Sequence, residues 1–326
     1  MKLVVIIPCL NEAKTIGPVI SQIPHQIPGI TQTLVLVIDD GSRDETASIA
    51  RQNGARVINH IRTRGVGAAF HSGIDAAIRF GADIVVNLDG DGQFNPGDIP
   101  TLIRPIIDRQ ADCVTASRFK SPDLIPDMPQ VKKWGNSMMA KLISFLVKRK
   151  YHDVSCGFRA YSLETILRMN LFGQFTYTQE TFLDLAFKNL IILEVPITVR
   201  GERKHGRSRV AYSLWNYAIQ SSKIIFRTFR DYKPLKFFTT LSLCLFFIAS
   251  CLGGFFLIYY LNTGKFTGHL WAGFSSGFLL LFSFLLFITG LLADIFTRLR
   301  GGQEKILYIE KRKIWEKARR TKNENF

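Results

Sequence analysis

The chain has 326 residues, 47% of them hydrophobic, which is enough for a sizeable soluble core and a further apolar part. A formal net charge of +16 calls for an anionic partner, but no zinc-finger spacing, RNA-binding signature or basic heptad helix supports nucleic acid. The five scattered cysteines indicate neither a disulfide framework nor a zinc site, and they fit a reducing compartment.

The first part of the chain alternates short β-rich runs with segments of helical periodicity, such as residues 67–82. This alternation predicts an α/β fold with a mostly parallel sheet and helices on both faces. Strands are expected at residues 2–8, 34–40, 56–61, 83–89 and 112–117.

Polar side chains follow each of these strands. Ligands of such sheets bind beyond the carboxyl ends of the strands, so these side chains form the candidate site. In chain order they are Asn11 and Glu12, Asp39 and Asp40, Arg62 and Arg64, Asp89 and Asp91, and Ser117 and Arg118.

The segment "NLDGDGQFNP" places two carboxylates, Asp89 and Asp91, directly after a strand. Mg²⁺ and Mn²⁺ prefer oxygen ligands and typically take one or two carboxylates, with phosphate oxygens completing the coordination. We therefore expect a divalent cation held by Asp91, with Asp89 as a metal or ribose contact and Gln93 as a supporting ligand. The competing interpretation is an ordinary Asp-Gly turn with solvated carboxylates.

The composition changes after Arg118, where proline and basic residues become frequent. Cations and aromatics then recur at helical spacing near residue 220, which is typical of a helix in a membrane interface. In chain order the sequence predicts a Pro-rich loop (119–130), a basic amphipathic helix (131–150), a turn-rich segment (153–162), a helix (177–190), a strand (190–199), a basic loop (200–209) and an interfacial helix (210–233).

Two uncharged runs, Phe237 to Asn262 and Phe266 to Ala293, each exceed the ~20 residues that cross a bilayer as a helix. We interpret them as two transmembrane helices. Two buried helices of a soluble domain are the alternative, although buried helices rarely stay uncharged for so long. Lysines and arginines precede the first run and follow the second, so the positive-inside tendency puts both ends in the cytosol.

Six motifs, in order, resemble those of family-two inverting glycosyltransferases of the GT-A (Rossmann-like) fold: "VVIIPCLNE", "VIDDGSRDET", "RGVGAAFHSGIDAA", "NLDGDGQFNP", "ASR" and "DVSCGFRAY". More narrowly, they resemble the polyprenyl- and dolichyl-phosphate sugar synthases, the group that includes dolichyl-phosphate mannose synthase. The likeness covers residues 1 to about 210. It implies that a nucleotide sugar and Mg²⁺ or Mn²⁺ are held by Pro8, Asn11, Glu12, Asp39, Asp40, Asp89, Asp91 and Gln93, the last three binding the metal and the diphosphate.

The resemblance also implies a polyprenyl-phosphate acceptor bound by cations. This chain departs from the family pattern at Arg209, which replaces a Lys, and at Lys133, which takes the place of a helix Arg and lacks its bidentate fork. Snorkelling at the membrane interface is the alternative role of these cations. The expected acceptor-phosphate contacts are Arg118, Lys133, Ser137, Arg203, Ser208 and Arg209.

A lipid phosphate has a second pKa near ~6 and is largely a dianion at neutral pH, so it can attack without a dedicated general base. Asp153 is the best remaining carboxylate for orienting the reacting groups, although it could equally be a turn residue paired with Arg159. Glu180 is the second candidate, because relatives that glycosylate hydroxyl groups place their base near that segment. The residues expected to act in catalysis are Asp91, Asp153, Arg118 and Arg203.

These inferences divide the chain into a cytosolic catalytic domain (1–209), juxtamembrane interfacial helices (210–234), a transmembrane hairpin (235–295) and a basic cytosolic tail (296–326). No secretory signal is recognised, because the first apolar run is short and lacks a cleavage site. The flanking cations make an anionic membrane surface the simplest partner of the positive charge.

The predicted activity is the inverting transfer of one hexose from a GDP- or UDP-linked sugar to polyprenyl phosphate at the cytosolic membrane face. Alternatives are a membrane glycosyltransferase with another lipid or glycan acceptor, and a non-catalytic protein that binds nucleotide sugars. A processive polysaccharide synthase would carry a Q-x-x-R-W signature, which "QSSKIIFRTF" lacks. Donor, lipid length, the choice of metal and a homo-oligomeric state are left open.

Overall fold

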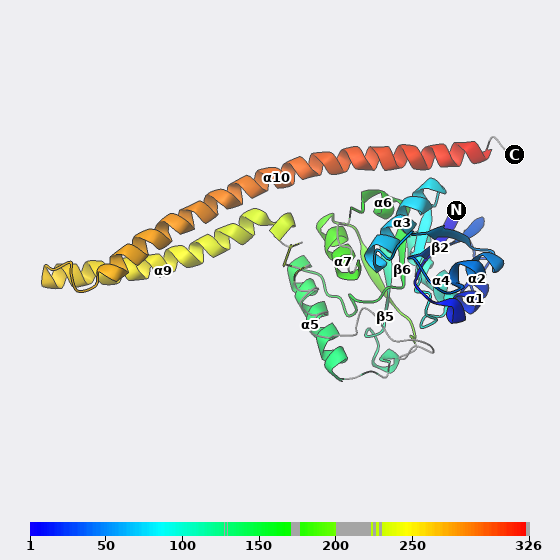
Figure 1. Ribbon diagram of the computed structural model, residues 1–326, viewed down its shortest axis with the longest axis horizontal. Coiled ribbons are helices and arrows are strands. Elements are labelled where there is room, and N and C mark those ends of the chain that lie inside the picture. Colours follow the sequence, from blue (N-terminus) through cyan, green and yellow to red (C-terminus); the bar gives the residue numbers. More distant parts are fainter. Residues whose placement is uncertain are drawn as a thin grey trace. The chain divides into compact units, whose positions relative to one another are not determined.

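The computed structural model describes residues 1–126, 128, 130–170, 177–199, 223, 226–227 and 230–323 (Figure 1). The chain divides into two units, Met1–Ile225 together with Ile306–Phe326, and Phe226–Lys305. The basic loop expected at 200–209 lies outside the described residues, as does most of the interfacial helix expected at 210–233.

Within the described residues, the first unit, which is expected from the sequence to be catalytic and is called the catalytic unit below, is built on a seven-stranded sheet with the order β3-β2-β1-β4-β6-β5-β7. All neighbouring strands are parallel except β6, which pairs antiparallel with both β4 and β5. The mostly parallel α/β fold predicted from the sequence is therefore confirmed. The strands are β1 (Lys2–Cys9), β2 (Gln32–Asp39), β3 (Arg56–Asn59), β4 (Ile84–Asn87), β5 (Cys113–Ser117), β6 (Arg159–Ser162) and β7 (Ile192–Pro196).

Both faces of the sheet are covered by helices, as the near-continuous apolar strands require. Alternate residues of β1 face opposite sides: Val4 and Ile6 pack with α3 and α7, and Val5 and Ile7 pack with α1 and α4. Figure 1 shows helices on either side of the strands. The helices of this unit are α1 (Ala13–Ser21), α2 (Thr46–Gln52), α3 (Val66–Arg79), α4 (Ile99–Ile107), α5 (Gln130–Val147), α6 (Leu163–Arg168) and α7 (Thr178–Phe187).

Strand β6 was not expected, because sequence reasoning assigned all of residues 153–162 to turns. Only four residues, "RAYS", form it, and they begin with a charged side chain, so the segment does not look like a buried strand. Arg159 is nevertheless 1% exposed. Its guanidinium donates to the main-chain oxygens of Thr178 and Val154, at 2.8 and 2.9 Å. The turns expected before it are correct, but the segment ends as a strand between β4 and β5.

The second unit contains two apolar helices, α9 (Pro234–Thr263) and the first part of α10 (Leu270–Asn323). Both are long and apolar enough to cross a membrane, and they are the candidate spans expected from the sequence. Serine hydroxyls join them: Ser242 and Ser283 each donate to the other's main-chain oxygen at 2.9 Å. Such hydrogen bonds between small residues are typical of helices packed in a membrane.

The end of α10 belongs to the catalytic unit, whereas the sequence suggested a separate basic tail from residue 296. The Trp315 indole donates to the main-chain oxygen of Ala82 at 2.8 Å, and Arg319 pairs with Asp83 at 3.1 Å. Tyr308 donates to Glu164 of α6 at 2.9 Å. This helix end therefore covers the segment before β4 and part of α6, at the edge of the sheet opposite the predicted site.

Candidate active site

The loop after β4 carries the expected pair of carboxylates in a tightly packed backbone. A Cβ atom on Gly90 would lie 2.5 Å from the Cys9 sulfur, so only glycine fits between the two loops. The Thr15 hydroxyl donates to the main-chain oxygen of Gly90 at 2.7 Å. Asp91 is 3% exposed and accepts a hydrogen bond from the main-chain nitrogen of Gln93 at 3.0 Å. Packing against β1 and α1 thus holds the acidic tip in place.

Negative charge converges around Cys9, the last residue of β1. Burial raises the pKa of the Cys9 thiol well above its ordinary value, and the charges of Glu12, Asp39, Asp89 and Asp91 raise the pKa further. The end of β2 and the segments after β1 and β4 therefore each place at least one of the expected carboxylates near this thiol.

Such a cluster suits a divalent cation, and its oxygen donors are those that Mg²⁺ and Mn²⁺ prefer. Among the described residues, no group of three or more His, Cys, Asp and Glu side chains is arranged to hold a metal by itself. The two carboxylates Asp89 and Asp91 would therefore need further oxygens, such as those of a diphosphate, to complete a coordination sphere. Gln93, the third expected ligand, is half-buried on the same loop.

The loops after β1 and β2 are bonded to each other. The Asn11 side-chain oxygen accepts from the main-chain nitrogen of Arg43 at 2.8 Å, and the Glu12 main-chain nitrogen donates to the Thr46 hydroxyl at 2.8 Å. Asn11 adopts a φ of 52°, a left-handed conformation that Asn tolerates. Pro8 is half-buried in β1. The residues expected around a nucleotide therefore form one connected rim.

Asp39 and Asp40 are both buried but make different contacts. Asp40 accepts from the main-chain nitrogens of Arg64 and Gly65 at 2.9 and 2.8 Å, and from the His60 ring at 2.7 Å. Asp39 accepts from the main-chain nitrogen of Ser42 at 3.1 Å. The carboxylate of Asp40 is thus engaged in holding the loop before α3, and Asp39 is the better placed of the two to contact a ligand.

His60 is a site residue that the sequence analysis did not single out. Its second ring nitrogen lies 2.9 Å from the Ser72 hydroxyl of α3, so the imidazole bridges Asp40 and α3. Only the fold brings these three residues together, because they stand on different elements.

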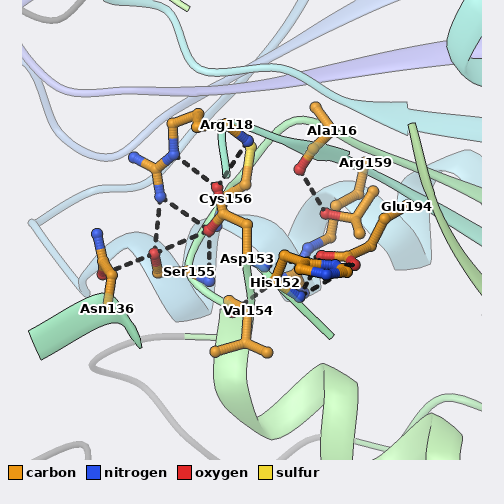
Figure 2. A network of polar contacts seen from close by, with 11 residues as sticks. Ala116, Arg118, Asn136, His152, Asp153, Val154, Ser155, Cys156, Arg159 and Glu194 are labelled. Atoms are coloured by element: carbon orange, nitrogen blue, oxygen red, sulfur yellow. Dashed lines mark hydrogen bonds and ion pairs between the residues drawn. The ribbon is translucent and has the colours of Figure 1, made fainter. Parts of the chain in front are cut away.

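The expected acceptor side is organised around Arg118, the first residue after β5 (Figure 2). Its guanidinium donates to both oxygens of Asp153, from Nε at 2.7 Å and from Nη2 at 2.9 Å. The main-chain nitrogen of Arg118 donates to the same carboxylate at 3.1 Å. The two residues thus form a bidentate pair that fixes the plane of the guanidinium.

Asp153 is 1% exposed. Burial by itself raises its pKa, but the Arg118 charge and several hydrogen bonds outweigh this effect and bring the pKa below its ordinary value. A carboxylate stabilised in its charged form is a poor proton acceptor, so the geometry is that of a residue that orients Arg118. The alternative partner considered for Asp153, Arg159, instead donates to main-chain oxygens.

Ser155 connects this pair to helix α5. Its hydroxyl accepts from Arg118 Nη2 at 2.7 Å and donates to the Asn136 side-chain oxygen at 3.1 Å (Figure 2). Lys133 and Ser137, the expected phosphate contacts on α5, lie within one turn of Asn136 and are half-buried and exposed, respectively. Neither Asn136 nor Ser155 was predicted, because only the fold brings Ser155 to Arg118 and Asn136 to Ser155.

Helix α5 also has two apolar faces. One face packs on the core of the unit, where Ala140 and Ile143 are buried. The other is exposed and consists of Trp134 (66% exposed), Met138 (56%), Leu142 (41%) and Phe145 (81%). These four recur at a spacing of three or four residues, so they form one stripe along the helix.

The metal side and the acceptor side meet at Gly157. A Cβ atom there would lie 2.9 Å from Asp89 Oδ2 and 3.0 Å from the Tyr177 hydroxyl. The Asn87 amide donates to the main-chain oxygen of Gly157 at 2.8 Å and to the Tyr177 hydroxyl at 2.7 Å. The segment 153–157 therefore touches Asp89 at one end and holds Arg118 at the other.

Glu180, the second candidate for a base, lies in the first turn of α7 and is 9% exposed. Arg159 bonds Thr178 and Val154 together, so the start of α7 lies beside the 153–157 segment. The remaining expected contacts, Arg203, Ser208 and Arg209, lie outside the described residues.

Comparison with known proteins shows what this chain is similar to. The family described as Glycosyl transferase family 2 matches residues 4–167. The chain is 34% identical over 213 residues to the UDP-N-acetylglucosamine–dolichyl-phosphate N-acetylglucosaminyltransferase of Methanococcus voltae, over 59% of this chain and 83% of that protein. It is 28% identical over 223 residues to polyprenol monophosphomannose synthase of Mycolicibacterium smegmatis, over 64% of this chain and 81% of that protein.

Among solved structures, the fold is similar to glucosyl-3-phosphoglycerate synthase from Mycobacterium tuberculosis in complex with Mn²⁺, uridine diphosphate and glucosyl-3-phosphoglycerate. The TM-score is 0.55 at 22% identity, and the match covers 70% of this chain and 79% of that one. At this level of identity the likeness concerns the fold.

Proposed function

The chain belongs to glycosyl transferase family 2 and has the GT-A fold, and we propose that it moves one hexose, with inversion, from a nucleotide sugar to polyprenyl phosphate. The observation that carries the proposal is the segment 153–157, which lies against Asp89 at Gly157 and holds Arg118 through Asp153. The relatives in Methanococcus voltae and Mycolicibacterium smegmatis, named for dolichyl-phosphate and polyprenol substrates, support the acceptor.

On the donor side, Asp89 and Asp91 would hold Mg²⁺ or Mn²⁺, with Gln93 in support. When bound, such a cation neutralises the charge that develops on the departing nucleoside diphosphate. The resemblance implied that Pro8, Asn11, Glu12 and Asp40, with Asp39 beside it, bind the base and ribose. Because Asp40 is bonded to the loop before α3, we assign this contact to Asp39 together with Asn11 and Glu12. The solved relative with Mn²⁺ and uridine diphosphate supports a divalent metal without deciding between the two ions.

On the acceptor side, Arg118 would orient the phosphate of the lipid. Asp153 holds the guanidinium plane in advance, so little ordering remains when the anion arrives. A phosphate dianion carries no proton that the reaction must remove, which agrees with an Asp153 that stays ionised. Transfer therefore needs alignment and charge neutralisation more than a general base.

The lipid part of the acceptor explains the exposed stripe on α5. A soluble monomer rarely exposes four large apolar side chains in one row. This stripe lies on the helix that reaches Arg118 through Asn136 and Ser155, so an apolar surface and a phosphate-binding cation share one element. The two candidate spans tether the chain to a membrane, and their flanking charges support a cytosolic catalytic unit.

Transfer of radiolabelled sugar into an organic-extractable product tests the proposal directly. The purified full chain would be given polyprenyl phosphate, Mg²⁺ or Mn²⁺, and each member of a panel of GDP- and UDP-sugars. Label in the lipid fraction with one donor, lost on adding EDTA, is the expected result. Label that appears only with a water-soluble acceptor such as 3-phosphoglycerate would overturn the lipid assignment. Nucleotide binding without transfer to any acceptor would indicate a non-catalytic binding protein.

A further inference from the structure

Glu194 on β7 stands behind the Arg118–Asp153 pair, and the reaction outlined above does not use it (Figure 2). The residue is 8% exposed. Its carboxylate accepts from the main-chain nitrogen of Asp153 at 2.7 Å and from the main-chain nitrogen of His152 at 2.9 and 3.0 Å. The His152 ring nitrogen Nδ1 lies 2.8 Å from the same carboxylate. One side chain thus gathers two successive backbone amides and an imidazole.

The sheet makes Glu194 a rigid reference for this segment. β7 pairs in parallel with β5, with Glu194 opposite Thr115 and Pro196 opposite Ser117. Arg118 follows Ser117 directly, so the paired strands β5 and β7 position both Arg118 and Glu194. The Lys120 side chain also donates to the main-chain oxygen of Glu194 at 2.6 Å. The 118–120 loop, through Lys120, and the 152–153 segment are therefore both hydrogen-bonded to Glu194.

A continuous set of hydrogen bonds connects Glu194 to the cation. The carboxylate holds the Asp153 main chain, and the Asp153 carboxylate holds the Arg118 guanidinium at both oxygens. Removing the carboxylate of Glu194 would leave the buried amide of Asp153 without its acceptor, which a buried amide does not tolerate. The segment would shift to find another partner, and the plane of Arg118 would shift with it.

We propose that Glu194 is a positioning residue for the acceptor phosphate, acting through the main chain of His152 and Asp153 on Arg118. The proposal rests on the proposed function for the identity of the acceptor. It assigns the effect of Glu194 to the acceptor alone, because the donor rim is held by contacts among the β1, β2 and β4 loops. The backbone amides carry the effect, and the partly exposed His152 ring is secondary.

Three substitutions in the full chain separate these contributions. Glu194→Ala removes every acceptor, whereas Glu194→Gln keeps one oxygen for the two amides. His152→Ala removes the ring and leaves both amides in place. Glu164→Gln is the matched control. Glu164 also binds a neighbouring side chain, Tyr308, but it lies on α6 and takes no part in the hydrogen bonds that connect Glu194 to Arg118.

Two readouts are measured on each variant: transfer kinetics with donor and acceptor varied separately, and binding of farnesyl phosphate by calorimetry. For Glu194→Ala we expect the acceptor KM and the farnesyl phosphate Kd to rise about tenfold, equivalent to ~1.4 kcal/mol, with the donor KM unchanged. Glu194→Gln should recover part of this loss. His152→Ala and Glu164→Gln should stay within about twofold of the wild type in both readouts.

An equal rise of the donor and acceptor KM in Glu194→Ala, or a fall in kcat alone, would overturn the assignment, because either result indicates a general structural role. So would a His152→Ala effect as large as that of Glu194→Ala. If the wild type transfers no sugar to any lipid, the proposed function fails, and farnesyl phosphate binding still decides whether Glu194 positions Arg118.

Discussion

The proposed donor side and the proposed acceptor side differ in the charges that surround their carboxylates. Around Cys9, the charges of four carboxylates raise the pKa of a thiol that burial has already raised. Around Arg118, one carboxylate is matched by a guanidinium, and the pKa of Asp153 is lowered despite its burial. The first arrangement favours an added cation, and the second presents a cation already oriented. The comparison indicates that the donor side suits a positively charged ligand and the acceptor side a negatively charged one.

The largest effect is expected from removing a carboxylate on the donor side. Asp91→Ala should lower kcat/KM for transfer by more than the ~100-fold typical of changes around a metal site, because a direct ligand is lost. Initial rates over a range of Mg²⁺ and Mn²⁺ concentrations measure this. Asp108→Asn, which removes one partner of an exposed pair with Arg104, is the control and should keep wild-type rates. Wild-type transfer by Asp91→Ala in EDTA would contradict the donor-side assignment.

The contact between the two sides is tested at Gly157. Gly157→Ala places a Cβ atom 2.9 Å from Asp89 Oδ2, so the carboxylate must move, and the apparent metal affinity should fall about tenfold. Gly135→Ala on α5 is the matched control, because nothing lies within 4 Å of its added Cβ atom. Titration of activity with Mn²⁺ compares the two variants. If both variants needed the same Mn²⁺ concentration for activity, the contact between Gly157 and Asp89 would not affect metal binding.

An effect of similar size, but on the acceptor instead of the metal, is expected from changing Arg118. Arg118→Lys keeps the charge but loses the two-pronged contact with Asp153, so the acceptor KM should rise about tenfold while the donor KM stays constant. Steady-state kinetics with each substrate varied in turn provide the measurement. A change confined to the donor KM would reverse the assignment of the two sides.

The smallest expected effect concerns acid stability. The folded pKa of Asp153 lies below the unfolded value of ~3.9, so its contribution is complete above that value and is lost as the pH falls toward the folded pKa. Asp153→Asn should therefore be less stable than the wild type at neutral pH but lose less stability on acidification. Thermal unfolding from pH 7 down to pH 3 would show converging melting temperatures. Melting temperatures that fall in parallel for the two proteins would mean that Arg118 does not stabilise the charged form of Asp153.

Much of the fold and of the donor side could be predicted because the signals are local. Asp89 and Asp91 stand one residue apart after an apolar run, and the alternation of strands and helices is visible without long-range information. Parallel strands bring their tips to one edge, so the convergence of Glu12, Asp39 and Asp91 follows from topology.

The residues that the sequence did not reveal act through distant partners. Glu194 lies 41 residues from Asp153, and His60 lies 20 residues from Asp40. Nothing in the neighbourhood of either residue signals its partner, and a lone His or Glu in a sequence is more often a surface residue. Strand β6 escaped prediction for a related reason, since its pairing with β4 and β5 depends on elements on both sides.

The helix end that covers the segment before β4 has a consequence for biosynthesis. Arg319 pairs with Asp83 across 236 residues, and Trp315 meets Ala82 across 233. At the ~5–20 residues per second of translation, Asp83 emerges roughly 12 to 47 s before its partner is made. The catalytic unit must therefore persist without these contacts while both candidate spans are synthesised, and the contacts form only after residues 315–319 have been made.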